Sequence, residues 1–243
     1  MFDVIEGKLG PLRSAMQLTL HTFHAVRLWQ GRAASEEKTA IIGFNGFVSA
    51  IRRVTQGAEQ GDPYADLWML RIQERLQGCK AELALIQDNL ELLMRAFPDA
   101  ISVEENFNIR PVRLPIVITT QYGYLAMYLL IAYDNIVRRL LQAHHVALID
   151  RREMESRIHA GARQLRGLFG LPRQYRSSGV TRADFAADND QARQASSRRA
   201  DFAPPLIGSR LGVAADGLAL EGSWPATVPG VDEHPVARLR AND

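Results

Sequence analysis

The sequence predicts a mainly helical α+β fold, a helical bundle around one long heptad helix with a small two-stranded antiparallel β element. Two patterns predict this fold. Apolar residues repeat every seven positions over about four heptads after Asp62-Pro63. Two short stretches, near residues 14–22 and 109–119, alternate apolar and polar residues as half-buried strands do. With 243 residues and 47% hydrophobic composition, the chain is long enough to bury a core.

The two predicted strands each have an apolar face and a polar face. The alternation places Met16, Leu18 and Leu20 on one side of the first strand. Val112, Leu114 and Ile116 form the matching side of the second strand. If both apolar faces point to the core, the opposite faces point outward together. The residues expected on this outward face are Arg13, Gln17, Thr19, His21 and Arg113.

The strongest periodic signal predicts a single helix from Pro63 to about Phe97. Asp62 is a suitable cap, and proline suits the first helical position. The seam consists of Met69, Ile72, Leu76, Cys79, Leu83, Ile86, Leu90, Leu93 and Phe97. Such a seam needs a partner helix. The apolar stretch 122–145 is the natural partner within the chain, but a second copy of the chain is an equally good partner.

Shorter helices are expected on either side of this pair. A helix with Phe44, Phe47, Val48, Ile51 and Val54 on its buried face follows a loop at residues 33–38. Asp150 caps a helix that runs to about Phe169, and Thr181 with Asp184 has the spacing of a capping box. We expect one domain over residues 1–202. Residues 203–243 are rich in Pro and Gly without periodicity, which predicts a flexible tail.

Positive charge is concentrated in one part of the chain. The whole sequence has a net charge of +2, but the segment from Arg138 to Arg199 contains thirteen arginines, no lysine and six acidic residues. Guanidinium groups form two-bonded contacts with phosphates and with guanine edges. Double-stranded DNA is therefore the first partner to consider.

Two groups of residues in this segment are candidate DNA phosphate ligands. Arginines lie on the polar face of the helix after Asp150, and others surround Ser177, Ser178 and a helix start near Thr181. The alternative is an ordinary solvated basic surface. The candidate phosphate-binding residues are Arg151, Arg152, Arg163, Arg166, Arg173, Arg176, Thr181 and Arg182.

The outward strand face is a candidate for reading base sequence. A two-stranded ribbon fits the major groove of DNA, where Arg, Gln and Thr side chains can contact base edges. The alternative is a plain two-stranded sheet whose polar face is solvated.

Candidate catalytic and metal-binding residues all have simpler interpretations. Cys79 falls in the heptad seam, and adjacent helical residues such as His144 and His145 point about 100° apart. Asp62 and Asp66 suit the start of a helix, where acidic side chains favour the dipole. No phosphate-binding loop, catalytic triad or metalloprotease motif occurs. We therefore expect no enzyme activity, no metal and no cofactor.

The sequence also gives an expectation for location. The first residues lack the pattern of a signal peptide, which favours the cytoplasm. Residues 114–133 carry no charge, but they contain proline, glycine and scattered tyrosines, which is unlike a membrane span.

Several motifs in combination give a family resemblance. These are Leu28-Trp-Gln-Gly-Arg32, Asp62-Pro-Tyr-Ala-Asp66, Ala132-Tyr-Asp134 with Arg138-Arg139, His145 to Asp150, and Tyr175-Arg-Ser-Ser-Gly-Val-Thr-Arg182. From about Leu12 to Arg199 the chain resembles the AcaB-like family of transcriptional regulators, also known as integrating conjugative element proteins. The resemblance implies a DNA-binding regulator of transfer genes with a ribbon-helix-helix-like element. The partners expected besides DNA are a second copy of the chain, through the heptad seam, and other regulators encoded by the element.

A scaffold protein that does not bind DNA could have the same heptad helix and the same family motifs. A scaffold of the element could use its heptad surface to bind another protein without contacting DNA. Binding to DNA that weakens steeply with salt favours the regulator, and indifference to DNA at low salt favours the scaffold.

Overall fold

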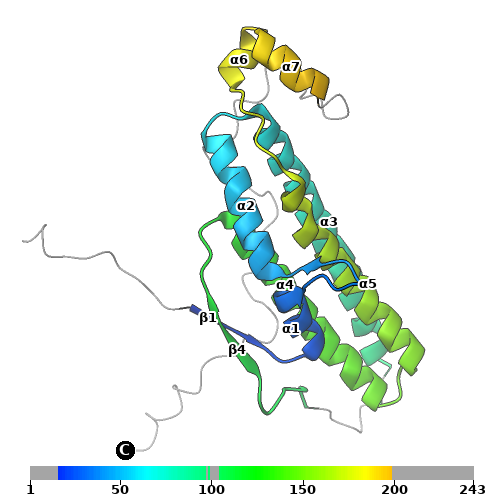
Figure 1. The fold of residues 1–243 in the computed structure, drawn as a ribbon. Coiled ribbons are helices and arrows are strands. Elements are labelled where there is room, and N and C mark those ends of the chain that lie inside the picture. Colours follow the sequence, from blue (N-terminus) through cyan, green and yellow to red (C-terminus); the bar gives the residue numbers. More distant parts are fainter. Residues whose placement is uncertain (1–15, 97, 99–103, 199–243) are drawn as a thin grey trace, which may run out of the picture.

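The computed structural model describes residues 16–96, 98 and 104–198 and shows a helical bundle with a short ribbon on one side (Figure 1). The main helices are α1 (Phe23–Gln30), α2 (Phe44–Glu59), α3 (Pro63–Met94), α4 (Gln121–His145) and α5 (Arg151–Gly170). A 3₁₀ turn, η1 (Leu171–Gln174), leads to α6 (Arg182–Ala186) and α7 (Asp190–Arg198). The strands are β1 (Met16–Leu20), β2 (Gly31–Arg32), β3 (Ile41–Ile42) and β4 (Val112–Ile116). The mainly helical α+β prediction is confirmed.

Helix α3 is the long heptad helix, and its seam packs within the chain. Asp62 caps it by accepting a bond from the backbone N–H of Tyr64, 2.9 Å away, and Pro63 is the first helical residue. The seam residues Ile72, Leu76, Cys79, Leu83 and Leu90 are buried, and α3 packs against α4 and α5. The partner predicted from residues 122–145 is therefore the one observed. The helix ends at Met94, before the predicted end at Phe97, which lies outside the described residues.

The other predicted helix starts are confirmed at the atomic level. The Asp150 carboxylate accepts a bond from Glu153 N–H at 2.7 Å and begins α5. Thr181 and Asp184 form the predicted capping box at the start of α6. Helices α6 and α7 pack through a small separate apolar cluster of Tyr64, Val180 and Ala195 at the N-terminal end of α3.

Strands β1 and β4 pair antiparallel to form a two-stranded ribbon. Leu18 lies opposite Leu114, and Thr19 lies opposite Arg113. The predicted alternation is confirmed for Leu18, Leu20 and Ile116, which join the core, and for Gln17, Thr19 and Arg113, which are exposed. Met16 and Val112, predicted on the apolar face, are instead 38% and 41% exposed. In a ribbon of only two strands each strand has a free edge, so Pro115 within β4 is compatible with pairing.

Each ribbon strand is followed by two helices. The chain runs β1–α1–α2 in its first part, with the short strands β2 and β3 between the two helices, and β4–α4–α5 in its second part. A threonine caps the helix directly after each strand: the Thr22 hydroxyl accepts from Ala25 N–H and the Thr120 hydroxyl accepts from Gly123 N–H. The chain therefore contains the strand–helix–helix order twice, with both strands of the ribbon supplied by one molecule. Helix α4, with 25 residues, is much longer than α1 with eight.

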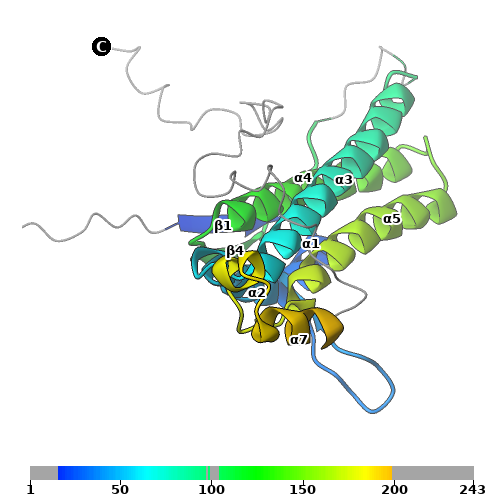
Figure 2. The same cartoon turned by 90° about the horizontal axis from the view of Figure 1, so that it is seen from above.

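The ribbon and α5 lie on different sides of the bundle. In Figure 1 the ribbon is at the left and α5 at the right, and the view from above in Figure 2 shows the same separation. A short β2–β3 pairing, Gly31 with Ile42 and Arg32 with Ile41, closes the loop predicted at residues 33–38. Among the described helices, none has the length and apolar character needed to span a membrane.

Candidate nucleic-acid interface

The outward face of the β1–β4 ribbon presents three of the predicted base-reading residues together. Gln17 and Thr19 come from β1 and Arg113 comes from β4. All three are exposed, and the register places Thr19 directly across from Arg113. On the opposite face, Leu18 and Leu20 are buried in the core, which holds the strand that carries the polar side chains in place. Arg13 lies outside the described residues.

His21 does not belong to this exposed face, which corrects the prediction. It follows β1, where its ring lies edge-on to Phe107 at 5.3 Å between centroids. Its Nδ1 accepts a bond from the backbone N–H of Asn108 at 3.3 Å, and Asn108 also donates to the His21 carbonyl at 3.0 Å. Burial lowers the pKa of His21, against the raising effect of Asp134. His21 therefore joins the end of the ribbon to residues 107–108.

Asp134 holds the junction between β1 and α1 against α4. Its carboxylate accepts bonds from the backbone N–H groups of His21 and Thr22, each at 2.9 Å, and from the Thr22 hydroxyl at 2.6 Å. Asp134 is 2% exposed, so these bonds replace the water that a carboxylate would otherwise keep. Sequence reasoning missed this role. The signal was present, since Asp134 is the first charged residue after a long uncharged stretch.

Arg138, one turn further along α4, positions the segment that leads to β4. Its guanidinium lies 4.3 Å from the centroid of the Phe107 ring. It also donates to the Asn106 carbonyl at 3.3 Å and to the Asn135 side chain at 2.8 Å. Helix α4 thus holds the segment that follows β1 and the segment that precedes β4, at the same end of the ribbon.

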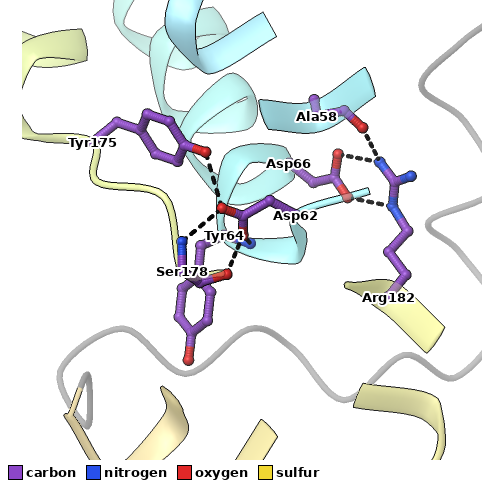
Figure 3. A network of polar contacts seen from close by, with 7 residues as sticks. All are labelled: Ala58, Asp62, Tyr64, Asp66, Tyr175, Ser178 and Arg182. Atoms are coloured by element: carbon purple, nitrogen blue, oxygen red, sulfur yellow. Dashed lines mark hydrogen bonds and ion pairs between the residues drawn. The ribbon is translucent and has the colours of Figure 1, made fainter. Parts of the chain in front are cut away.

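Arg182, predicted to bind phosphate, is used inside the protein instead. Its Nε and Nη2 atoms donate to the two carboxylate oxygens of Asp66 at 2.8 and 2.6 Å, and Nη2 also donates to the Ala58 carbonyl (Figure 3). Asp66 is 8% exposed. The hydrogen bonds to Asp66 raise the pKa of Arg182 further. We therefore remove Arg182 from the phosphate-binding set.

The hydroxyl groups expected beside Arg182 are also engaged. Buried Asp62 accepts from the Tyr175 hydroxyl at 2.9 Å and from the Ser178 hydroxyl and N–H at 2.7 and 2.9 Å (Figure 3). The Thr181 hydroxyl bonds Asp184 in the capping box. The predicted phosphate site around residues 177–182 is wrong in this respect, because the Ser178 and Thr181 hydroxyls bond carboxylates within the protein. The bonds to Asp62 join the segment before α6 to the start of α3. We call the contacts of Asp62 and Asp66 with Tyr175, Ser178 and Arg182 the aspartate joint.

Several of the thirteen clustered arginines pair with carboxylates. Arg151 pairs with Glu155 at 2.8 Å, Arg157 with Glu153 at 2.6 Å, and Arg139 with Glu91 at 3.3 Å. Within residues 104–198, by contrast, no acidic partner is found for Arg152, Arg163, Arg166, Arg173 or Arg176.

The arginines without an acidic partner form a stripe along α5 and continue beyond its end. Arg152, His159 and Arg163 are exposed and half-buried Arg166 lies beside them, away from buried Ile158. Arg173 and Arg176 follow the helix, and Arg176 donates to the carbonyls of Arg173 and Tyr175. Because α5 has 20 residues, its two ends lie about 30 Å apart. The predicted phosphate-binding arginines are thus spread along the length of α5 and beyond it, and they do not form one compact site.

Of the residues singled out as candidate nucleophile or metal ligands, Cys79 lies on α3, whereas His144 and His145 lie on α4. Among the described residues no cluster of three or more His, Cys, Asp or Glu side chains could hold a metal ion. Cys79 is buried in the seam, where burial raises the pKa of its thiol and its sulfur donates to the Gln164 carbonyl. His144 contacts the Ile149 carbonyl at 3.1 Å near the end of α4.

Comparison with known proteins identifies the family. The family model of the transcriptional regulator AcaB matches residues 8–208 of the chain. The chain belongs to the AcaB family of transcriptional regulators. A solved structure, selenomethionine-containing AcaB from uropathogenic E. coli, has the same fold with a TM-score of 0.52 and 14% identity. The match covers 79% of this chain and 92% of the other. A search of curated proteins gave no match.

The structure gives roles to the residues that carry the resemblance to the AcaB family. Asp62-Pro-Tyr-Ala-Asp66 and the segment from Tyr175 to Arg182 meet in the aspartate joint. Asp134 and Arg138 support the ribbon from α4. These motif residues hold the fold of an AcaB-family chain together, whereas the exposed ribbon residues lie outside the motifs.

Proposed function

We propose that the protein binds double-stranded DNA through the outward face of the β1–β4 ribbon and thereby regulates genes of a conjugative element. The observation that carries the proposal is the shared exposed face of Gln17, Thr19 and Arg113 on a rigidly supported two-stranded ribbon. An antiparallel ribbon has the width to enter the major groove. The assignment to a family of transcriptional regulators supports this use, and the resemblance to conjugative-element proteins supports the choice of target genes.

Each ribbon side chain suits a different part of a base pair. Arg113 can donate two bonds to the O6 and N7 of guanine, and Gln17 can pair with the N6 and N7 of adenine. Thr19 offers a hydroxyl and a methyl group, which suit either a base acceptor or a thymine methyl. Sequence preference would come from these contacts.

Phosphate contacts are proposed for the α5 arginines and those after the helix, namely Arg151, Arg152, Arg163, Arg166, Arg173 and Arg176. Arg151 is included because exposed ion pairs such as Arg151–Glu155 contribute little and can be exchanged for phosphate. Helix α5, which carries the first four of these residues, lies on a different side of the bundle from the ribbon. We therefore assign them to general, salt-sensitive affinity and assign sequence choice to the ribbon.

A binding titration with selected DNA tests the proposal. Duplexes enriched from a random pool by the full-length protein would be compared with scrambled duplexes by fluorescence anisotropy. We expect Arg113→Ala to reduce the preference for the selected duplex by about 10-fold to 100-fold, the loss expected for one two-bonded base contact. Arg193→Ala removes the same charge from exposed α7 and serves as the matched control.

Two results would contradict the proposal. Unchanged preference in Gln17→Ala/Thr19→Ala/Arg113→Ala would place base readout elsewhere. No binding of the wild-type protein to any duplex at low salt would favour the non-DNA-binding scaffold of the element.

A further inference from the structure

A second stripe with heptad spacing runs along α3 on the side away from the buried seam. Gly78, Leu85 and Leu92 are spaced by seven residues, and Ala81 lies between the first two. Leu85 is 57% exposed and Leu92 is 61% exposed, although both are large apolar side chains, Leu85 within α3 and Leu92 in its last turn. A Cβ atom added at Gly78 would meet nothing within 4 Å. We call Gly78, Ala81, Leu85 and Leu92 the outer stripe.

The outer stripe is small at one end and bulky at the other. Gly78 and Ala81 leave a shallow part of the helix surface, and Leu85 and Leu92 project from it. A parallel copy would set leucine against leucine and leave the two glycines facing each other across a gap. An antiparallel copy centred on Leu85 sets Leu92 of each chain over Gly78 of the other, so each projecting side chain meets a recess.

Charges at the ends of the stripe agree with the antiparallel arrangement. Arg95 lies ten residues after Leu85, and Glu74 lies eleven residues before it. In the antiparallel pair, Arg95 of one chain therefore lies at nearly the same level along the helices as Glu74 of the other. Both side chains are exposed. Opposite charges at the rim of an apolar contact fix its register and direction more than its affinity.

We propose that the outer stripe is a self-association surface, through which two copies of the chain pair antiparallel along α3. The inner seam, which by itself allowed a dimer, is filled by α4 and α5 of the same chain. The contact with a second copy is therefore assigned to the exposed side of α3. A dimer of this kind carries two separate β1–β4 ribbons.

Sedimentation and light scattering of the full-length protein test the proposal. We expect a species of twice the 27.1 kDa chain mass at about 100 μM protein. Leu85→Glu/Leu92→Glu places four acidic groups in the paired stripe and should weaken association by about 100-fold or more. Ala84→Glu, exposed on the same helix but beside the stripe, should leave the dimer intact. Circular dichroism checks that each variant remains helical.

Cysteine pairing tests the direction of the helices. When Gly78→Cys and Leu92→Cys proteins are mixed under mild oxidation, we expect the mixed disulfide to dominate. Disulfides only between identical variants would mean parallel helices and overturn the proposed arrangement. A wild-type protein that stays monomeric at about 100 μM would overturn self-association. A monomer whose Leu85→Cys thiol resists a maleimide reagent would show that another segment of the same chain covers the stripe. All of these outcomes are independent of DNA binding.

Discussion

Arg182 and Asp66 form a two-bonded ion pair between α6 and the first turn of α3, with donor–acceptor distances of 2.8 and 2.6 Å. Residues 116 positions apart in the sequence are joined by this contact. It decides between two roles for Arg182, because a guanidinium held by a buried carboxylate is not available to a DNA phosphate.

The pair should therefore contribute to stability and not to DNA affinity. Arg182→Met leaves the nearly buried Asp66 carboxylate without its partner and should lower the free energy of unfolding by about 2 kcal/mol, measured by urea denaturation. Arg193→Met breaks an exposed pair with Asp188 and should cost less than about 0.5 kcal/mol. Loss of DNA affinity in fully folded Arg182→Met would restore the phosphate-binding interpretation.

A steric test of the aspartate joint is available at Gly57. A Cβ atom at this position would overlap the hydroxyl of Tyr175, which bonds Asp62. Gly57→Ala should therefore displace Tyr175 and reduce stability by about 2 kcal/mol, although alanine normally favours a helix.

Gly170→Ala is the matched control for Gly57→Ala, because an added Cβ meets nothing within 4 Å and the backbone is already right-handed helical. It should raise stability by about 0.5 kcal/mol. Thermal melts that give the same shift for both variants would contradict the close contact between Gly57 and Tyr175.

Removal of the Asp134 carboxylate should lower the free energy of unfolding more than removal of an ordinary helix cap does. Asp134→Ala removes the acceptor of three hydrogen bonds at a buried site and should cost about 3 kcal/mol. Asp150→Ala removes one exposed cap bond at α5 and should cost about 1 kcal/mol. Equal denaturation midpoints for the two variants would show that Asp134 does not hold the ribbon to α4.

The end of the ribbon should respond to pH through His21. Burial lowers the pKa of His21 below its ordinary value of 6.5, so the neutral ring is favoured in the folded state. The resulting stability is present above pH 6.5 and is lost as the pH falls through the folded-state pKa. Protonation also removes Nδ1 as the acceptor of the Asn108 N–H.

An NMR titration of the His21 ring should give a pKa below 6.5. His21→Gln should show a smaller loss of stability between about pH 7 and pH 5 than the wild type. A pKa above 6.5 would mean that attraction to Asp134 outweighs burial.

The sequence predicts those parts of the fold that depend on local pattern. The heptad spacing from Met69 identifies α3, and the capping residues Asp62, Asp150 and Thr181 mark three helix starts because their bonds reach only two or three residues along the chain. The alternation in residues 16–20 and 112–116 identifies both ribbon strands and their outward faces.

Long-range partners are not predictable from this sequence alone. Nothing in the local pattern pairs Arg182 with Asp66 or Asp134 with Thr22, since each partner lies more than 100 positions away. The clustering of arginine in the sequence therefore overstated the positive surface, because carboxylates from distant or neighbouring turns neutralise several of these side chains. His21 was misplaced for a related reason, since the segment that covers it comes from residues 107–108.

Site-specific photo-crosslinking tests the DNA-binding proposal most directly. A photoreactive amino acid would replace Thr19 on the ribbon, Arg163 on the α5 stripe, or Gln77 on exposed α3, each in full-length protein with selected duplex DNA. We predict that position 19 crosslinks to bases within the selected site, position 163 crosslinks without sequence preference, and position 77 does not crosslink. Base-specific crosslinks from position 163 or 77 together with none from position 19 would contradict major-groove reading by the ribbon.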